Sequence, residues 1–215
     1  MMQLEQRPAH EANYSVGRAG RAPDRIVVHI AAGTLEGTAA WFANPAARVS
    51  AHFTVGADGR VYQHVSETDT AWHAGDLEAN RRSIGIEHEG FHGPNEAWWS
   101  PTEAQLQASA ELAAAICRRW SIIPDQFGIV PHSAVNPRKP LCPGPGFPLD
   151  SYRALVASFL QPERAPTRYV PVRLFDPMTN EQIGLGTFVA GTDKVYVKSL
   201  GPLMAAGREG SPRGG

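Results

Sequence analysis

The sequence predicts an α/β protein: a mixed central β-sheet flanked by helices, followed by a small β-rich C-terminal extension. Between residues 25 and 162, short β-type runs alternate with segments of helical periodicity, which is typical of helices packed on one sheet. After residue 163, the only regular pattern is short β-type runs separated by turn residues, at 170–175, 182–189 and 194–198. A chain of 215 residues is long enough for one substantial core with a small appendage.

Composition divides the chain into four segments. Residues 1–24 are polar and contain glycine and arginine, which predicts an N-terminal arm. Residues 25–162 form the main domain, and residues 163–206 form the β-rich extension. The tail at 207–215 consists of glycine, proline, serine and charged residues, which predicts disorder.

The β-type runs of the main domain are, in chain order, 25–30, 49–55, 60–65, 83–89 and 127–130. The first run is apolar, predicts a buried strand and places His29 at the end of it. Asp58-Gly59 lies between the second and third runs and is a strong signal for a β-hairpin. In the fourth run, Ile84 and Ile86 share one face and Glu87 lies on the other.

Three segments have helical signals. A short helix follows the first strand and ends near Asn44. A longer helix begins with Ser100 as its N-cap, with proline next and glutamate at the capping-box position, and its apolar residues recur to Trp120. Apolar spacing predicts a last helix over 148–161.

The overall composition excludes several classes of protein. A net charge of -1 gives no electrostatic reason to bind nucleic acid. No apolar stretch approaches the roughly 18–20 residues that span a membrane. The first residues lack the apolar core of a secretory signal, so we expect synthesis in the cytosol and, for any action outside the cell, a release route that the chain does not encode. We expect a monomer.

The strongest chemical signal is a set of three possible metal ligands, His29, His132 and Cys142. The last two flank a proline-rich loop, and Cys142 has no apolar periodicity around it, whereas Cys117 falls on the apolar stripe of the long helix and belongs to the core. Three protein ligands leave one tetrahedral position of zinc open, as in catalytic sites. A structural zinc site needs a fourth protein ligand, and no obvious one is present. His29 alone would as easily be structural.

Several segments, in this order, resemble the zinc-dependent N-acetylmuramoyl-L-alanine amidases of the type 2 family, which includes phage endolysins, cytoplasmic anhydro-muropeptide amidases and peptidoglycan recognition proteins. The segments are Ile26-Val-Val-His29, Val49-Ser-Ala-His-Phe53, Asp58-Gly59, Ala71-Trp-His-Ala-Gly75, Ser83-Ile-Gly-Ile-Glu87 and His132 with Cys142-Pro-Gly144. The resemblance covers residues 13–160. It implies a mixed sheet with helices around it and a cleft that holds one zinc ion on His29, His132 and Cys142.

The resemblance also implies a substrate, the amide between N-acetylmuramic acid and L-alanine in bacterial peptidoglycan. Cys142 stands where the cytoplasmic branch has aspartate, which favours a bacteriolytic, antimicrobial phage-type endolysin. Glu87 matches the general base of the cytoplasmic branch, and Ala51 replaces a tyrosine of other members as that branch does, so a recycling amidase is the alternative. A non-catalytic peptidoglycan-binding module is a third possibility, although such proteins typically replace the last ligand.

Two catalytic residues are expected. Glu87 would transfer protons between water and the departing amine, with Glu89 on the same strand face as its competitor. Lys139 would stabilise the oxyanion, although the family usually places its lysine one position later, where this chain has Pro140.

The expected substrate-binding residues are Arg48, His73, Asn80 and Arg138. The two arginines suit the carboxylates of a stem peptide because a guanidinium binds a carboxylate through two hydrogen bonds. His73 would form the cleft wall or, alternatively, lie in the core as a hydrogen-bonded histidine. Trp98 and Trp99 could stack on a sugar or pack beside the long helix.

Overall fold

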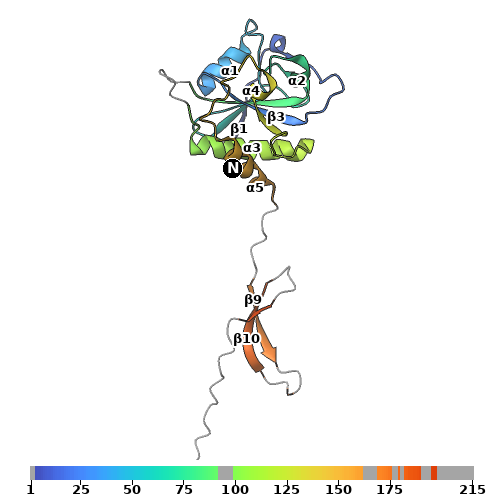
Figure 1. Ribbon diagram of the computed structural model, residues 1–215, viewed down its shortest axis with the longest axis vertical. Coiled ribbons are helices and arrows are strands. Elements are labelled where there is room, and N and C mark those ends of the chain that lie inside the picture. The colour runs from blue at the N-terminus through green and yellow to red at the C-terminus, as the bar shows by residue number, and fades with distance from the viewer. Residues whose placement is uncertain are drawn as a thin grey trace, which may run out of the picture. The chain divides into compact units, whose positions relative to one another are not determined.

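The computed structural model describes residues 3–91, 99–161 and 179, together with the backbone of 169–175, 182–189 and 195–197. The chain divides into two compact units, Met1–Gln161 and Pro162–Gly215, and each is described by itself (Figure 1). Trp98 and the tail at 207–215 lie outside the described residues.

The first unit is built on a six-stranded mixed sheet. Its strands, in order across the sheet, are β1 (Gln3–Gln6), β5 (Arg60–Gln63), β4 (Phe53–Val55), β7 (Ser83–His88), β3 (Arg25–Ile30) and β8 (Ile129–Pro131). Only the β4–β5 pair is antiparallel; β1 runs with β5, and the other four strands run parallel to one another. The predicted α/β class and the hairpin at Asp58-Gly59 are therefore confirmed. A separate pair joins β2 (Tyr14–Ser15) to β6 (Thr70–Ala71).

Helices cover both faces of this sheet. α3 (Glu103–Trp120) and α5 (Leu149–Leu160) lie on one face, and α1 (Leu35–Ala43), α2 (Leu77–Arg81) and α4 (His132–Val135) lie on the other (Figure 1). The main core lies on the α3 and α5 side. Its buried residues include Ile26, Val28, Phe53, Val55, Ile84, Ile86, Leu112, Ile116, Tyr152 and Val156.

Successive side chains of a strand point to opposite faces, so the alternate residues of these strands face α1 and α4. Ile84 and Ile86 belong to the main core, as predicted, so Glu87 faces the opposite side of β7. His29 pairs with Glu87 in the β3–β7 register and therefore shares that side. The two parallel central strands thus deliver a histidine and a glutamate next to each other.

The structure corrects the predicted start of the long helix. The N-cap of α3 is Thr102, whose Oγ1 accepts a hydrogen bond from the backbone N–H of Gln105, and Ser100 lies before the helix. Threonine followed three residues later by glutamine is itself a capping sequence. Here, however, the Gln105 side chain donates to the carbonyls of Val55 and Glu89, and so ties α3 to the sheet.

Two other boundaries differ from the sequence-based expectation. Within 49–55 only Phe53–Val55 form a strand. Residues 3–24 form part of the first unit, because β1 extends the sheet as an edge strand and β2 pairs with β6. The polar composition of β1 concealed this strand: an edge strand exposes its side chains and needs no apolar pattern.

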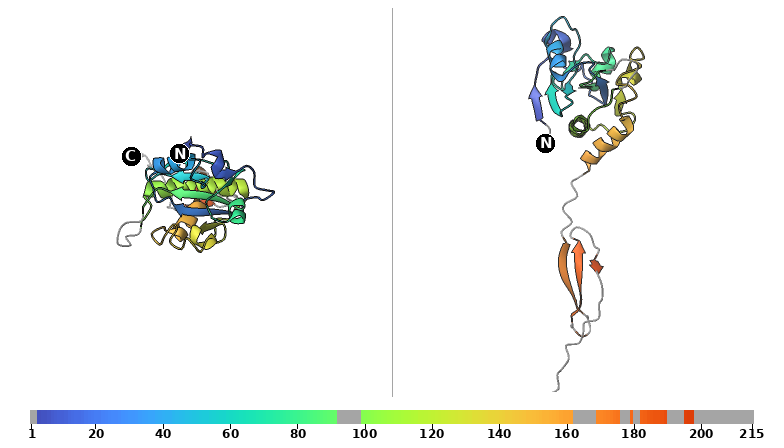
Figure 2. Two further views of the ribbon diagram at one scale, coloured as in Figure 1. Left: turned by 90° about the horizontal axis from the view of Figure 1, so that it is seen from above. Right: turned by 90° about the vertical axis from the view of Figure 1, so that its left-hand side faces the viewer.

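The second unit contains a three-stranded antiparallel sheet. β10 (Gln182–Val189) is central, between β9 (Tyr169–Phe175) and β11 (Val195–Val197) (Figure 2). These strands coincide with the short β-type runs predicted after residue 163. Among the helices that the structure describes, none is long and apolar enough to cross a membrane.

Candidate metal centre and active site

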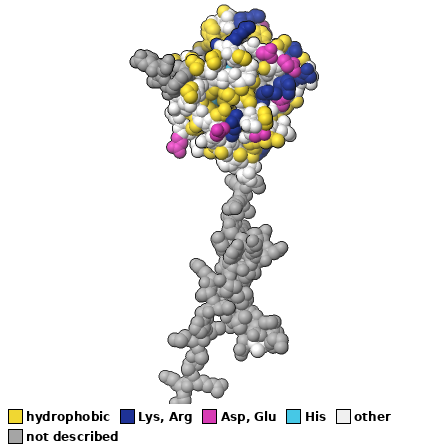
Figure 3. Space-filling model, viewed as in Figure 1, with side chains coloured by type: hydrophobic (Ala, Val, Ile, Leu, Met, Phe, Trp, Pro, Cys, Tyr) yellow, Lys and Arg dark blue, Asp and Glu magenta, His cyan; other side chains and the backbone are white. Residues whose placement is uncertain are grey.

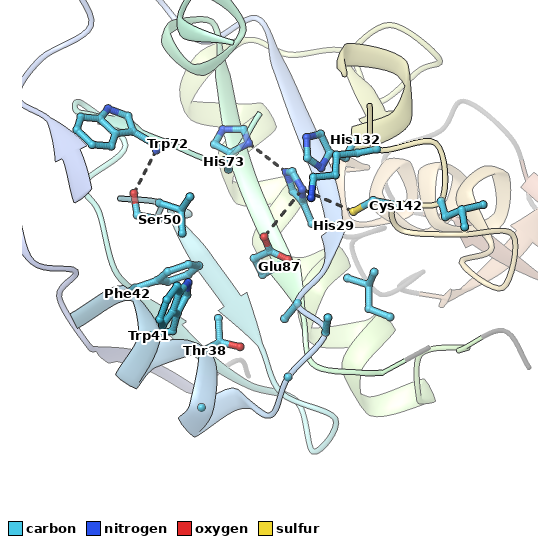
Figure 4. A pocket seen from close by; sticks show the side chains of 18 of the residues that line it. His29, Thr38, Trp41, Phe42, Ser50, Trp72, His73, Glu87, His132 and Cys142 are labelled. Atoms are coloured by element: carbon cyan, nitrogen blue, oxygen red, sulfur yellow. Dashed lines mark hydrogen bonds and ion pairs between the residues drawn. The ribbon is translucent and has the colours of Figure 1, made fainter. Parts of the chain in front are cut away.

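Three elements bring the predicted metal ligands together at one edge of the sheet. His29 lies near the end of β3, His132 begins α4 directly after β8, and Cys142 lies in the loop that follows α4. Because β3 and β8 are adjacent and parallel, their carboxyl ends meet, which is where ligands bind in open α/β sheets. One ligand atom from each of the three residues lies within 4.8 Å of the others (Figure 4).

The chemistry of these donors fits a zinc-type ion. The Nδ1 of His29 lies 3.9 Å from Sγ of Cys142, close to the roughly 3.5 Å expected between nitrogen and sulfur on one tetrahedral zinc. Burial lowers the pKa of His29 and of His132, so both imidazoles are neutral, as ligation requires. Burial, with the Glu87 carboxylate nearby, raises the pKa of Cys142 to about 12, so a cation that binds Sγ must displace the thiol proton.

Hydrogen bonding fixes which nitrogen of His132 is available. Its Nε2 lies 3.3 Å from the carbonyl oxygen of Ala74, and a carbonyl can only accept, so Nε2 carries the proton. The Nδ1 of His132 is therefore free. Asn136 donates to the same carbonyl at 3.0 Å, which ties the ligand loop to the segment after β6.

Glu87 lies beside this cluster. Its Oε1 is 3.9 Å from Nδ1 of His29, and its side chain is 14% exposed. Its Oε2 is buried and has no hydrogen-bond partner among the described residues. Burial raises the pKa of Glu87 to about 8, and Lys139 partly opposes this rise. A carboxyl group that lines the cavity beside three possible metal ligands can exchange protons with a water or a substrate.

Glu89, the predicted competitor of Glu87, is committed elsewhere. Its Oε2 accepts a hydrogen bond from the backbone N–H of Ala57 at 2.8 Å, and it does not line the cavity. It stabilises the turn between β4 and β5. The geometry thus separates two glutamates that the strand pattern placed on one face.

An open cavity of about 700 Å³ contains the cluster. Its lining includes the predicted metal ligands, Glu87, Arg138 and Lys139, with His73 beside His29. Arg48 does not line the cavity, but its guanidinium lies 5.4 Å from the ring centre of Trp72, which does. On the face of the first unit seen in Figure 3, basic side chains lie beside acidic ones.

Asn80 has a different place from the one expected. It is 5% exposed and does not line the cavity. Its Oδ1 accepts hydrogen bonds from the backbone N–H groups of His73 at 3.1 Å and Ala74 at 2.7 Å. The structure therefore makes Asn80 a clamp on residues 73–74 and gives it no surface for substrate. Trp99 likewise packs on Phe147, with ring centres 6.3 Å apart, as the packing alternative predicted.

The aromatic wall of the cavity was missed from the sequence. Trp41 and Phe42 of α1, with Trp72, lie on the side of Glu87 away from Cys142 (Figure 4). A signal was present, because consecutive helix residues point about 100° apart, so two neighbouring aromatic residues cannot both lie at the centre of the buried face. Phe42 is 5% exposed and Trp41 is 51% exposed. The exposed tryptophan lines the cavity.

Comparison with known proteins agrees with this geometry. Residues 19–145 match the family model described as N-acetylmuramoyl-L-alanine amidase. The chain belongs to this amidase family. Its sequence is 32% identical over 167 residues to N-acetylmuramoyl-L-alanine amidase A of Achromobacter lyticus, covering 69% of this chain and 90% of that protein.

Two further comparisons point to the same family. The chain is 35% identical over 116 residues to the 1,6-anhydro-N-acetylmuramyl-L-alanine amidase AmpD of Salmonella typhimurium, covering 51% of this chain and 58% of that protein. It superposes on a crystal structure of AmpD with a TM-score of 0.58 and 27% identity, over 72% of this chain and 93% of that one. The amidase assignment made from the sequence is confirmed, and so is its fold.

Proposed function

We propose that this amidase holds one zinc ion on His29, His132 and Cys142 and cleaves the amide between N-acetylmuramic acid and L-alanine in peptidoglycan. The observation that supports this most directly is the convergence of three donors and Glu87 in one cavity. Among the described residues, no fourth protein ligand belongs to this group, which leaves one coordination position for solvent or substrate. When bound there, zinc supplies Lewis-acid chemistry, since it acidifies a water and polarises a carbonyl group.

Glu87 is the proposed proton carrier. Its Oε1 faces the metal ligands, 3.9 Å from Nδ1 of His29, so Glu87 in its carboxylate form, which a bound cation would favour, can take a proton from the attacking water. The same oxygen can then give this proton to the nitrogen of L-alanine as the amide bond breaks. His29 lies beside Glu87, because the two residues are register partners on β3 and β7.

Lys139 is the proposed partner of the oxyanion. It lines the cavity together with Cys142, and its charge acts on both Glu87 and Cys142. Residues 136–142 form successive turns, with Lys139 N–H bonded to the Asn136 carbonyl and Cys142 N–H bonded to the Lys139 carbonyl. We infer that these turns absorb the one-residue shift that puts proline at position 140.

Substrate contacts are proposed for the two ends of the cavity. Arg138 lines the ligand side and suits a carboxylate of the stem peptide. Trp41 and Trp72 offer flat apolar surfaces for a sugar ring on the opposite side, with Arg48 packed on Trp72. His73 is hydrogen-bonded to His29, so we propose that it supports this metal ligand and does not bind the substrate.

We infer action on intact cell walls, as a phage-type endolysin would have, with synthesis in the cytosol and activity after release. Cys142 and the additional β-rich unit support this inference. A recycling amidase is the second candidate, supported by Glu87 and by the similarity to AmpD.

Two substrates tested side by side separate the candidates. The zinc-loaded full chain is added to suspended cell walls, with turbidity recorded, and to a soluble anhydro-muropeptide. Mass spectrometry identifies the bond that is cut. Clearing of walls with release of free L-alanine amino groups supports the endolysin assignment, and hydrolysis of the soluble substrate alone supports recycling. No cleavage of either substrate contradicts the proposed function.

A further inference from the structure

A chain of hydrogen bonds runs from α2 to the metal ligand His29. The hydroxyl of Ser83 donates to the carbonyl oxygen of Ala79 at 2.6 Å. The same oxygen of Ser83 lies 3.3 Å from Nε2 of His73. The Nδ1 of His73 lies 3.0 Å from Nε2 of His29 (Figure 4). The side chains of Ser83, His73 and His29 are buried.

The direction of this chain follows from its first step. A carbonyl oxygen has no proton to give, so the short Ser83–Ala79 contact uses the single hydroxyl proton of Ser83. The Ser83 oxygen can then only accept a hydrogen bond from His73, so Nε2 of His73 must carry a proton. A neutral imidazole carries only one, so Nδ1 of His73 is bare and accepts from Nε2–H of His29.

The last step leaves His29 in one form. With its proton on Nε2, its Nδ1 is bare, and Nδ1 is the atom that faces Cys142 and Glu87. The opposite form would put an N–H on the metal side and leave a lone pair of His73 against the oxygen of Ser83. We propose that Ser83 and His73 are positioning residues that hold His29 with its Nδ1 free for the metal.

The backbone around His73 supports this role independently. The ring lies directly against the β7 backbone: a Cβ at Gly85 would be only 2.5 Å from Cγ of His73. Asn80 holds the backbone N–H groups of His73 and Ala74, and the carbonyl of Ala74 orients His132. One clamped segment therefore orients both histidine ligands, each through an Nε2–H.

The proposal rests on the proposed metal site, because it assigns a purpose to the free Nδ1 of His29. It gives a role to His73, which lines the cavity and is also buried and hydrogen-bonded to His29. Partners of this kind typically contribute about 10- to 100-fold to metal affinity.

The direct test is nitrogen NMR of the histidine rings in the zinc-free full chain at neutral pH. We expect His29 and His73 each to carry the proton on Nε2 in the wild-type chain. In Ser83→Ala the acceptor for His73 is lost, and we expect His29 to show a mixture of both ring forms. A wild-type His29 protonated on Nδ1, or unchanged ring forms in Ser83→Ala, would overturn the proposal.

Zinc affinity, measured by competition with a chromophoric chelator, provides the second readout. We expect Ser83→Ala to bind zinc about 10-fold more weakly and Ser83→Thr, which keeps the hydroxyl, to restore most of the affinity. At the next step, His73→Asn keeps an acceptor for His29, and we expect it to bind zinc more tightly than His73→Leu. If Ser83→Ala and Ser83→Thr bound zinc equally, and His73→Asn and His73→Leu did too, the proposed hydrogen-bond relay from Ser83 through His73 to His29 would be overturned.

The controls separate this proposal from the proposed function. If wild-type protein binds no zinc but His29 has the expected ring form that Ser83→Ala disturbs, the metal assignment fails and the relay stands. If wild-type binds zinc and the variants match it in affinity and ring form, the relay fails and the metal assignment stands. Should Ser83→Ala fail to fold, the zinc affinities of His73→Asn and His73→Leu and the NMR spectrum of the wild-type chain still test the proposal.

Discussion

Replacing Asn80 distinguishes a clamp from a substrate contact. Its Oδ1 satisfies two buried backbone N–H groups, those of His73 and Ala74. Asn80→Ala leaves both unsatisfied, and each such group costs about 1–3 kcal/mol. Allowing for relaxation, we expect the free energy of unfolding to fall by roughly 3 kcal/mol. Asn80→Asp keeps an oxygen acceptor, so we expect a much smaller loss.

Tryptophan fluorescence during urea unfolding measures this effect in the first unit alone, because all 5 tryptophans lie between Trp41 and Trp120. With a urea dependence of about 2 kcal/mol/M, a loss of roughly 3 kcal/mol lowers the midpoint by about 1.5 M. Zinc affinity should fall as well, since the clamped segment orients His29 and His132. An unchanged midpoint together with a raised KM would refute the clamp and restore Asn80 as a substrate contact.

Three further predictions concern catalysis, pH and metal. Glu87→Gln should lower kcat by about 10²- to 10⁴-fold without loss of zinc. The matched control Glu89→Gln should keep near-normal activity. Equal effects of the two substitutions would show that Glu87 is not the proton carrier. Burial lowers the pKa of His64 to about 4, and the neutral ring bonds to the Arg7 carbonyl and Thr54 hydroxyl. The contribution of neutral His64 to stability is therefore fully present above pH 6.5, and the free energy of unfolding falls by roughly 3 kcal/mol as the pH drops toward 4. His64→Gln should flatten the dependence of stability on pH over that interval. Removing zinc with a chelator should lower the Tm, and zinc at about 1,000 times its Kd should add about 4 kcal/mol, an increment that Cys142→Ser should largely lose.

The main strands could be predicted from sequence because their signals are local, whereas the grouping of His29, His132 and Cys142, which the structure brings together, was inferred with the help of the family resemblance. An apolar run with a histidine at its end marks a buried strand that points at a sheet edge, and β3 has this form. The alternation in 83–89 placed Glu87 opposite Ile84 and Ile86, and the burial of these isoleucines bears this out. Such patterns depend only on residues next to each other in the chain.

The role of Asn80 and the course of β1 could not be predicted in this way. Asn80 is as polar as a surface residue, and only the fold shows that its oxygen meets two N–H groups. β1 joins the sheet beside β5, more than fifty residues later, and its polar side chains carry no periodic signal. The cap at Thr102 was ambiguous because Ser100 offers an equally good local pattern, and the contacts of Gln105 with the sheet decide between them.

Zinc X-ray absorption on the loaded full chain tests the central claim most directly. A site formed by His29, His132 and Cys142 predicts one sulfur at about 2.3 Å and lighter atoms at about 2.0–2.1 Å. Cys142→Ser should remove the sulfur signal, and Cys117→Ser, which alters only the buried core cysteine, should keep it. Two sulfurs, or a sulfur signal that survives Cys142→Ser, would contradict the account.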